Sequence, residues 1–383
     1  MDFSLSMEQE ILRNSVRDFA ENEIKPVAGE LDEKEIFSYD TMKKMAELGL
    51  FGMFVSEKYG GQGMDYVSYI IATEEIARID GSHAATVAAG NSLGIGPLYY
   101  FGNEDQKQRY LPKLCSGEAL WGFGLTEPDA GSDAANSKTT AVLDGDEWVI
   151  NGSKIFITNA STDITSGVTA LCRTGTREDG RPELSCIFIE TGTPGFETRE
   201  MHGKLMWRAS NTSELYFDDC RVPKENMLGP RGDGFHQMMQ TLDGGRLSIG
   251  AMGLGGAQGC FDLALKYSKE RSQFGKPISH FQVNAFKLAD MALEIECARL
   301  ILYKACWLRD QNKPFSKEAA MAKLHCSEVM YRCANHAVQL HGGYGLMKEY
   351  DVERFYRDQK LLEIGEGTSE VQRIVISRLI GAL

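Results

Sequence analysis

The chain has 383 residues, of which 43% are hydrophobic and 25% are charged. These fractions match ordinary globular proteins, which excludes an intrinsically disordered chain and a small scaffold held together by disulfides or metal. Acidic residues outnumber basic ones by 54 to 41, so the net charge at pH 7 is −13. This charge argues against broad binding to nucleic acid or to an anionic membrane, because the protein's field repels polyanions.

No stretch of the sequence approaches the apolar length of a membrane span, and the chain begins without the pattern of a leader peptide. We therefore expect a cytoplasmic protein. The nine cysteines are scattered singly, without a C-x-x-C pair or a cysteine and histidine cluster at zinc spacing. We expect free, mostly buried thiols and no metal site.

The first part of the chain, residues 1–119, reads as α-helical. Leu12, Val16, Phe19 and Ala20 form one apolar stripe at helical spacing, which we expect to end at Pro26. Helical patterning continues to about residue 119, so an N-terminal α-helical domain is predicted.

Residues 120–230 change to the pattern of strands. Thr139–Leu143 and Trp148–Ile150 flank an Asp-Gly turn, which predicts a hairpin. Further runs of strand length are Val168–Leu171, Ser185–Ile189 and Leu215–Phe217. The segment is predicted to form a middle β domain.

Helical periodicity returns over residues 231–383. One face of a long helix is predicted to carry Leu288, Ala292, Ile295, Leu302 and Cys306, and Pro314 is expected to stop it. Long helices with short loops predict an antiparallel bundle. The fold class is therefore α+β, in the order α, β, α.

A glycine-rich run, Gly253–Gly259, suggests a dinucleotide-binding loop at first sight. It has Gln258 where the third glycine of G-x-G-x-x-G should stand, and no predicted strand precedes it. We interpret these small residues as a site of close helix packing.

Several other segments combine glycine with polar or charged side chains. Phe123–Asp133 could bind an oxygen-rich ligand through backbone N–H groups, or form a plain loop. Asp243–Arg246 could be a kink or a local ion pair, or an anchor for a polar ligand tail. Arg271 at a bend could meet a phosphate, or be an ordinary solvated helix end. Glu366, between two glycines and before Thr368 near a helix N-cap, could be solvated or could be a general base.

Together with Phe156–Thr158 and Gln339–Gly345, these segments follow the order and spacing of the acyl-CoA dehydrogenase family, which the chain resembles over essentially its whole length. The resemblance implies an N-terminal helical domain (1–119), a middle β-barrel or sandwich domain (120–230) and a C-terminal four-helix bundle (231–383). It also implies FAD as cofactor, an acyl-CoA substrate, an electron-transfer flavoprotein as electron acceptor, and a homotetramer built as a dimer of dimers.

The resemblance also implies the residues of the site. For the flavin it implies Phe123, Leu125, Thr126, Phe156 and Thr158, with Ser132 at the flavin phosphates or the CoA arm, and Thr368 and Glu370 close by. Toward the FAD of a neighbouring subunit it implies Arg271, Gln273, Phe274, Gln339 and Gly343, and further cofactor contacts are Gln282 and Gly342. For the substrate it implies Ser132, Asp243, Arg246, Gly367, Asn91 and Gly365.

By the same resemblance, Glu366 removes the α-proton of the thioester while a hydride passes from the β-carbon to flavin N5, giving the 2,3-enoyl-CoA. The backbone N–H of Glu366 and a ribityl hydroxyl of FAD would stabilise the enolate. Some relatives carry the base at the position of Gly245, which has no side chain to abstract a proton.

The substrate expectation depends on Gly365, where straight-chain relatives often have an aromatic residue. The missing ring, with Ala88, Ala89 and Gly90 nearby by resemblance, leads us to expect a bulky acyl group, branched or alicyclic, such as cyclohexanecarboxyl-CoA. A short-chain, butyryl-type dehydrogenase and an oxygen-using acyl-CoA oxidase are the alternatives of the same fold. A non-catalytic scaffold and an acyl-CoA-binding module are alternatives of another class.

Overall fold

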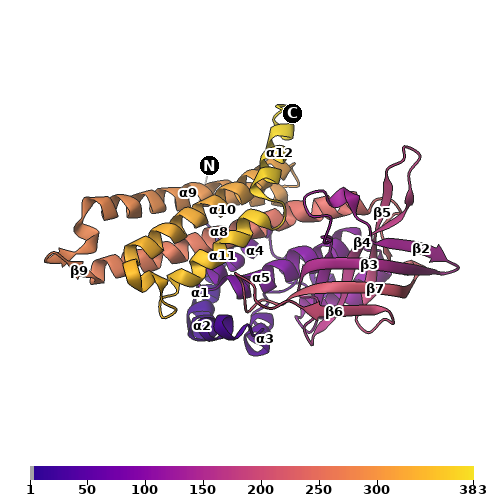
Figure 1. Cartoon of the computed structure of the whole chain (residues 1–383), viewed down its shortest axis with the longest axis horizontal. Coiled ribbons are helices and arrows are strands. Elements are labelled where there is room, and N and C mark those ends of the chain that lie inside the picture. Colours follow the sequence, from indigo (N-terminus) through magenta and orange to yellow (C-terminus); the bar gives the residue numbers. More distant parts are fainter. Residues whose placement is uncertain (1–3) are drawn as a thin grey trace.

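The computed structural model describes residues 4–383, so the first three residues of the predicted N-terminal domain lie outside the described residues. Helices come first, then a sheet, then helices again, which confirms the predicted α+β order (Figure 1). The helices before the sheet are α1 (Met7–Phe19), α2 (Lys25–Lys34), α3 (Tyr39–Glu47), α4 (Tyr66–Ala77), α5 (Gly81–Ala89), α6 (Gly96–Phe101) and α7 (Glu104–Cys115). The elements after the sheet are α8 (Gly234–Glu270), the short strands β9 (Ser272–Gln273) and β10 (Lys276–Pro277), α9 (Gln282–Asp310), α10 (Ser316–His341), α11 (Val352–Ile364) and α12 (Ser369–Leu379).

The predicted end of the first helix at Pro26 is wrong. The chain passes from α1 through one π-helical segment, Ala20–Ile24, directly into α2. Pro26 lies in the first turn of α2, directly after the π-helical segment, and proline is tolerated in a first turn. The helical run therefore continues to Lys34.

The middle segment forms one mixed sheet. Its strands are β1 (Leu120–Gly124), β2 (Thr140–Asp144), β3 (Glu147–Thr158), β4 (Thr165–Thr176), β5 (Pro182–Glu190), β6 (Phe196–Glu200), β7 (Thr212–Pro223) and β8 (Met227–Leu228). Their order across the sheet is β6-β7-β3-β2-β4-β5-β8, with β1 parallel to β4. The predicted hairpin is confirmed, because β2 pairs with β3 in antiparallel register across the Asp-Gly turn.

The last part of the chain forms the predicted antiparallel bundle around α8, and α9 matches the expected long helix. The apolar stripe predicted for α9 is only partly confirmed. Leu288 and Ile295 are buried as expected, but Ala292 is exposed, so its assignment to the buried face is wrong. Met291 takes its place on the buried face, because the 3.6-residue period brings position 291 rather than 292 above Ile295.

The glycine run of α8 is a packing surface, as expected. Cβ atoms added to Gly255 and Gly259 would each lie 2.2 Å from a backbone oxygen, that of Glu74 or of Arg78. Only glycine allows α8 to approach the end of α4 so closely. The helices before and after the sheet consequently share one apolar core, in which Val87 and Leu302 are both fully buried.

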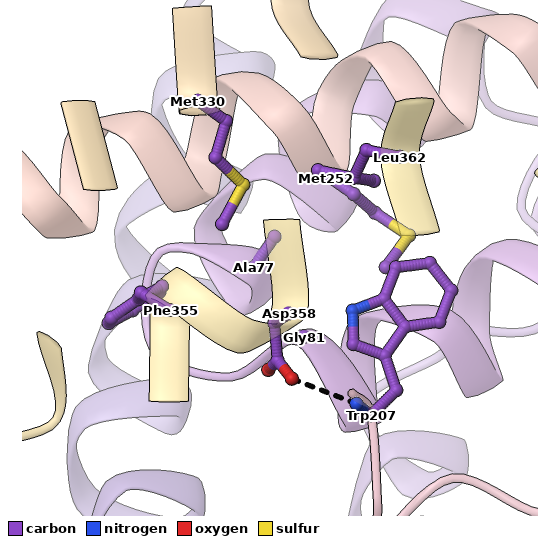
Figure 2. A pocket seen from close by; sticks show the side chains of 8 residues that line it. All are labelled: Ala77, Gly81, Trp207, Met252, Met330, Phe355, Asp358 and Leu362. Atoms are coloured by element: carbon purple, nitrogen blue, oxygen red, sulfur yellow. Dashed lines mark hydrogen bonds between the residues drawn. The ribbon is translucent and has the colours of Figure 1, made fainter. Parts of the chain in front are cut away.

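The sheet lies at one end of the molecule and the β9 turn at the opposite end (Figure 1). A cavity of about 10 Å³, large enough for one water molecule, lies between α11 and the loop after β6, and Figure 2 shows the side chains that line it. At this cavity, Oδ1 of Asp358 accepts a hydrogen bond of 2.8 Å from the backbone N–H of Trp207.

All nine cysteines are unpaired, and Cys297 alone among them is exposed, which confirms the expectation of free, mostly buried thiols. Across residues 4–383, none of the helices combines the length and the apolar character that crossing a membrane requires.

Candidate active site

Glu366 lies in the short turn between α11 and α12. Glu366 and Gly367 both have left-handed backbone conformations, with φ of 52° and 93°. Thr368 then caps α12, as predicted, because its Oγ1 accepts a hydrogen bond of 3.2 Å from the N–H of Val371. The turn places the Glu366 carboxylate against α8, where a Cβ atom added to Gly245 would lie 2.0 Å from Oε2.

The carboxylate of Glu366 is held without a partner. Its Oε2 is buried and accepts no hydrogen bond within the described residues. Burial raises the pKa of Glu366 to about 7, although the positive charges of Lys323 and Arg246 act in the opposite direction. A buried carboxylate that is free of hydrogen bonds and titrates near neutrality can take up a proton from a bound molecule.

Asp243 and Arg246 lie on α8 beside this carboxylate. The helix is continuous here, and of the two alternatives left open by the sequence the local ion pair is present: Nη1 of Arg246 donates to Oδ1 of Asp243. Oδ2 of Asp243 in turn accepts a hydrogen bond of 2.5 Å from Ser316. Nε of Arg246 is buried without a partner, so this guanidinium retains a donor for a ligand.

The residues predicted to meet the flavin lie close to the same part of α8. Phe123 and Leu125 belong to an apolar cluster that includes Leu242, one helical turn before Gly245 and the Glu366 carboxylate. Thr126 and Thr158 are half-buried.

Phe156 has a left-handed backbone, with φ of 63°, and its side chain is 62% exposed. A bulky residue is uncommon in that conformation, and an uncovered ring at the end of β3 offers a surface for a planar aromatic group. This uncovered ring fits the isoalloxazine of FAD.

A buried ion pair that was not predicted fixes this segment to β3. Nζ of Lys154, a residue with 1% exposure, donates to Oε1 of Glu127 at 2.7 Å and to the Leu125 carbonyl at 3.3 Å. The Thr126 carbonyl accepts a hydrogen bond from the N–H of Ile155 at 2.9 Å. The alternation of β3 could have identified Lys154, because it falls on the same face as the buried Trp148 and Ile150.

A second group of predicted cofactor residues lies at the opposite end of the bundle. Its exposed members are Arg271, Gln273, Phe274, Gln282, Gln339, Gly342 and Gly343. The Arg271 guanidinium lies 5.7 Å from the ring of Tyr344, so the two loops are adjacent, and Phe274 is 93% exposed. One chain does not bring this group to Phe123 and Phe156, because the sheet and the β9 turn lie at opposite ends of the molecule (Figure 1).

The remaining predicted residues are dispersed. Ser132 and Glu370 are exposed, and Gly365 lies beside Leu361. Asn91 is fully buried, and its amide donates to the carbonyls of Leu50 and Val87. Its polar atoms are therefore used within the chain.

Two residues that were not predicted to belong to the site donate hydrogen bonds to the Glu366 turn. Lys323 donates to the Gly367 carbonyl at 2.7 Å, and Gln372 donates to the same carbonyl at 2.9 Å. The helical period could have identified Lys323, because it shares a face of α10 with Ala319 and Cys326, both fully buried.

Comparison with known proteins gives matches along the whole chain. Residues 6–118, 122–220 and 232–381 match the N-terminal, middle and C-terminal domains of acyl-CoA dehydrogenases. The chain is 53% identical to a protein of Bacillus subtilis (strain 168) described as probable acyl-CoA dehydrogenase YngJ, over 99% of each chain.

Two solved structures have nearly the same fold. Butyryl-CoA dehydrogenase from Megasphaera elsdenii superposes with a TM-score of 0.95 at 42% identity, over 99% of this chain and 100% of the other. A structure described as an electron transferring flavoprotein of Acidaminococcus fermentans gives a TM-score of 0.96 at 43% identity, over 99% of each chain.

Proposed function

Because the chain belongs to the acyl-CoA dehydrogenase family, a family of FAD-dependent oxidoreductases, we propose that it desaturates an acyl-CoA between Cα and Cβ with Glu366 as the base. The observation that carries this assignment is the buried oxygen of Glu366, which has no partner and lies against the side-chain-free Gly245. Among the residues of this site, it is the carboxylate prepared to accept a proton.

The chain's own groups define the chemistry at the thioester. The α-proton passes to the Glu366 carboxylate, whose pKa burial raises to about 7, so it is a stronger base than an exposed glutamate. The backbone N–H of Glu366 is proposed to donate to the thioester oxygen, where negative charge develops. Arg246 and Asp243, next along α8, are proposed to contact the polar arm of CoA.

Phe123, Leu125, Thr126, Phe156 and Thr158 would hold FAD, and the uncovered Phe156 ring supports this placement. When bound, FAD supplies the acceptor for the β-hydride.

For the acyl group we propose a short straight chain. The name of the Megasphaera elsdenii relative supports this proposal. A bulky branched or alicyclic group is the second candidate, because a Cβ atom added to Gly365 would have only ordinary contacts, with Leu361 at 3.4 Å or more.

We propose that the protein assembles as a homotetramer. In it, the end of the bundle that carries Arg271 and Gln339 would contact the FAD bound to another subunit. Two observations support it: the distance of that end from Phe156 within one chain, and a row of exposed apolar side chains at seven-residue intervals on α9. These are Phe286, Leu293, Leu300 and Trp307. An electron-transfer flavoprotein is the proposed electron acceptor.

The test is anaerobic mixing of the purified yellow holoenzyme with butyryl-, isovaleryl- and cyclohexanecarboxyl-CoA while flavin bleaching is recorded. We expect rapid bleaching by the wild type with butyryl-CoA first, and a loss of at least a thousandfold in Glu366→Gln with the yellow colour kept. Rapid bleaching in the variant would show that Glu366 is not the base. Faster bleaching by the cyclic thioester would select the second substrate candidate.

Two further measurements separate the alternatives. Oxygen consumption compared with dye reduction distinguishes an oxidase from a dehydrogenase. Thioester binding without any bleaching in the wild type would favour a binding module.

A further inference from the structure

Lys323 is an unusual feature of the interior. It lies on α10 among Ala319, Cys326 and Met330, and its side chain has 0% exposure. Its Nζ forms no ion pair within residues 4–383 and donates instead to the Gly367 carbonyl at 2.7 Å. Lysine is almost never fully buried without a charged partner.

Such a residue costs stability. Burial disfavours the ammonium and lowers the pKa of Lys323 to about 8, although Glu366 acts in the opposite direction. An apolar residue at this position of α10 would pack without that cost. Because this cost is borne next to the Glu366 turn, we look for a function of the Lys323 ammonium at that turn.

The hydrogen bond of Lys323 is shared with a neutral donor. Nε2 of Gln372, also fully buried, donates to the Gly367 carbonyl at 2.9 Å and to the Glu366 carbonyl at 3.2 Å. A non-glycine residue at a φ of 52° is strained, so the turn needs such support. Both residues donate to the same carbonyl, but Lys323 also carries a positive charge, which the amide of Gln372 does not.

We infer that Lys323 is a positioning residue for the proposed base: its hydrogen bond to the Gly367 carbonyl holds the Glu366–Gly367 turn, and its buried positive charge favours the ionised form of the Glu366 carboxylate. This role rests on the proposed function and deepens it. Charge is needed at this point because Glu366 has no hydrogen-bond donor of its own at Oε2.

Other charged and titratable groups face the same region. Arg246 on α8 is always cationic, Tyr69 lies on α4, and Glu363 on α11 and Glu370 on α12 act on Lys323. Of the two cations that act on Glu366, only Lys323 loses its charge within the working pH range.

The test compares Lys323→Met with Gln372→Leu in the holoenzyme. The first removes a hydrogen bond and a charge, and the second removes only hydrogen bonds. In Lys323→Met we expect the acid limb of the pH profile for flavin reduction to move up by about one unit. Activity should then fall about fivefold at pH 7 and recover near pH 9, because Glu366 must be ionised to act.

Gln372→Leu should lower the rate of flavin reduction at every pH without shifting the acid limb of the pH profile. Lys323→Arg should keep the acid limb at its wild-type position. A second readout is the infrared carbonyl band of protonated Glu366, identified by its absence in Glu366→Gln. Its titration midpoint should move up in Lys323→Met, whatever the activity.

If the limb and the infrared midpoint stay in place in Lys323→Met, the inferred charge role is overturned. Loss of folding in Lys323→Met together with a shifted limb in Lys323→Arg would overturn it as well. Continued rapid flavin reduction in Glu366→Gln would be a different failure, that of the proposed base.

Discussion

At the scale of single residues, the absence of a side chain at Gly245 is as important as the presence of one at Glu366. A Cβ atom at 245 would lie 2.0 Å from Oε2, far inside van der Waals contact. The carboxylate therefore reaches its place because α8 carries glycine there.

Gly245→Ala tests this dependence. The methyl group should push the carboxylate aside and lower the rate of flavin reduction at least tenfold, since misplacement by about 1 Å can cost a hundredfold. Alanine favours helix by about 1 kcal/mol over glycine, so the melting temperature should not fall. Gly250→Ala is the control on the same helix, because its Cβ would meet the movable side chain of Leu302 at 3.0 Å. A wild-type rate in Gly245→Ala would contradict the packing argument.

At the scale of elements, β3 and the segment after β1 act as one unit joined by Lys154 and Glu127. Burial favours the protonated form of Glu127, but the charge and hydrogen bond of Lys154 hold its pKa at about 2. The folded-state pKa is therefore below the unfolded value, so the stabilisation is present above about pH 4 and is lost as pH falls toward 2.

Lys154→Met should leave Glu127 as a buried charge without its cation. We expect a loss of about 3–5 kcal/mol in the free energy of unfolding, acid unfolding at a higher pH, and weaker FAD binding through release of Leu125 and Thr126. Urea titration and flavin retention on gel filtration measure these effects. The double variant Lys154→Met with Glu127→Gln should regain stability; if it is no more stable than the single variant, the pair is not the cause.

Local patterns predicted most of these elements, and contacts distant in sequence explain what they missed. The Asp-Gly turn fixes the β2–β3 hairpin within a few residues, so the sequence alone could predict it. Lys323 and Gly367 are 44 residues apart, and no local period relates them. The family resemblance identified Glu366 as the base, but its support by Lys323 and Gln372 appears only when α10 and α12 are folded together.

At the scale of the whole molecule, the proposed FAD site combines two separated groups of residues, so the proposal calls for more than one copy of the chain. Replacing Leu293 and Leu300 by aspartate would place charges in the exposed apolar row of α9. We expect the assembly to dissociate into smaller species that lose FAD, as measured by sedimentation and by the flavin absorbance. Val142→Asp, on β2 and 63% exposed, is the control that should stay assembled. An unchanged sedimentation coefficient in the double variant would contradict the proposal that α9 lies in the subunit interface.

The apolar core shared by α4, α5 and α8 has a consequence for how the chain melts. The helices that precede and follow the sheet in sequence contribute side chains to the same interior, whereas Ile150 and Leu215 of the sheet belong to a separate apolar cluster. Calorimetry should accordingly show a single heat-absorption peak for both helical regions. A fragment ending near residue 119 would contain only part of the shared apolar core, so we expect it to aggregate rather than fold. A shortened form of this protein should therefore retain both helical regions.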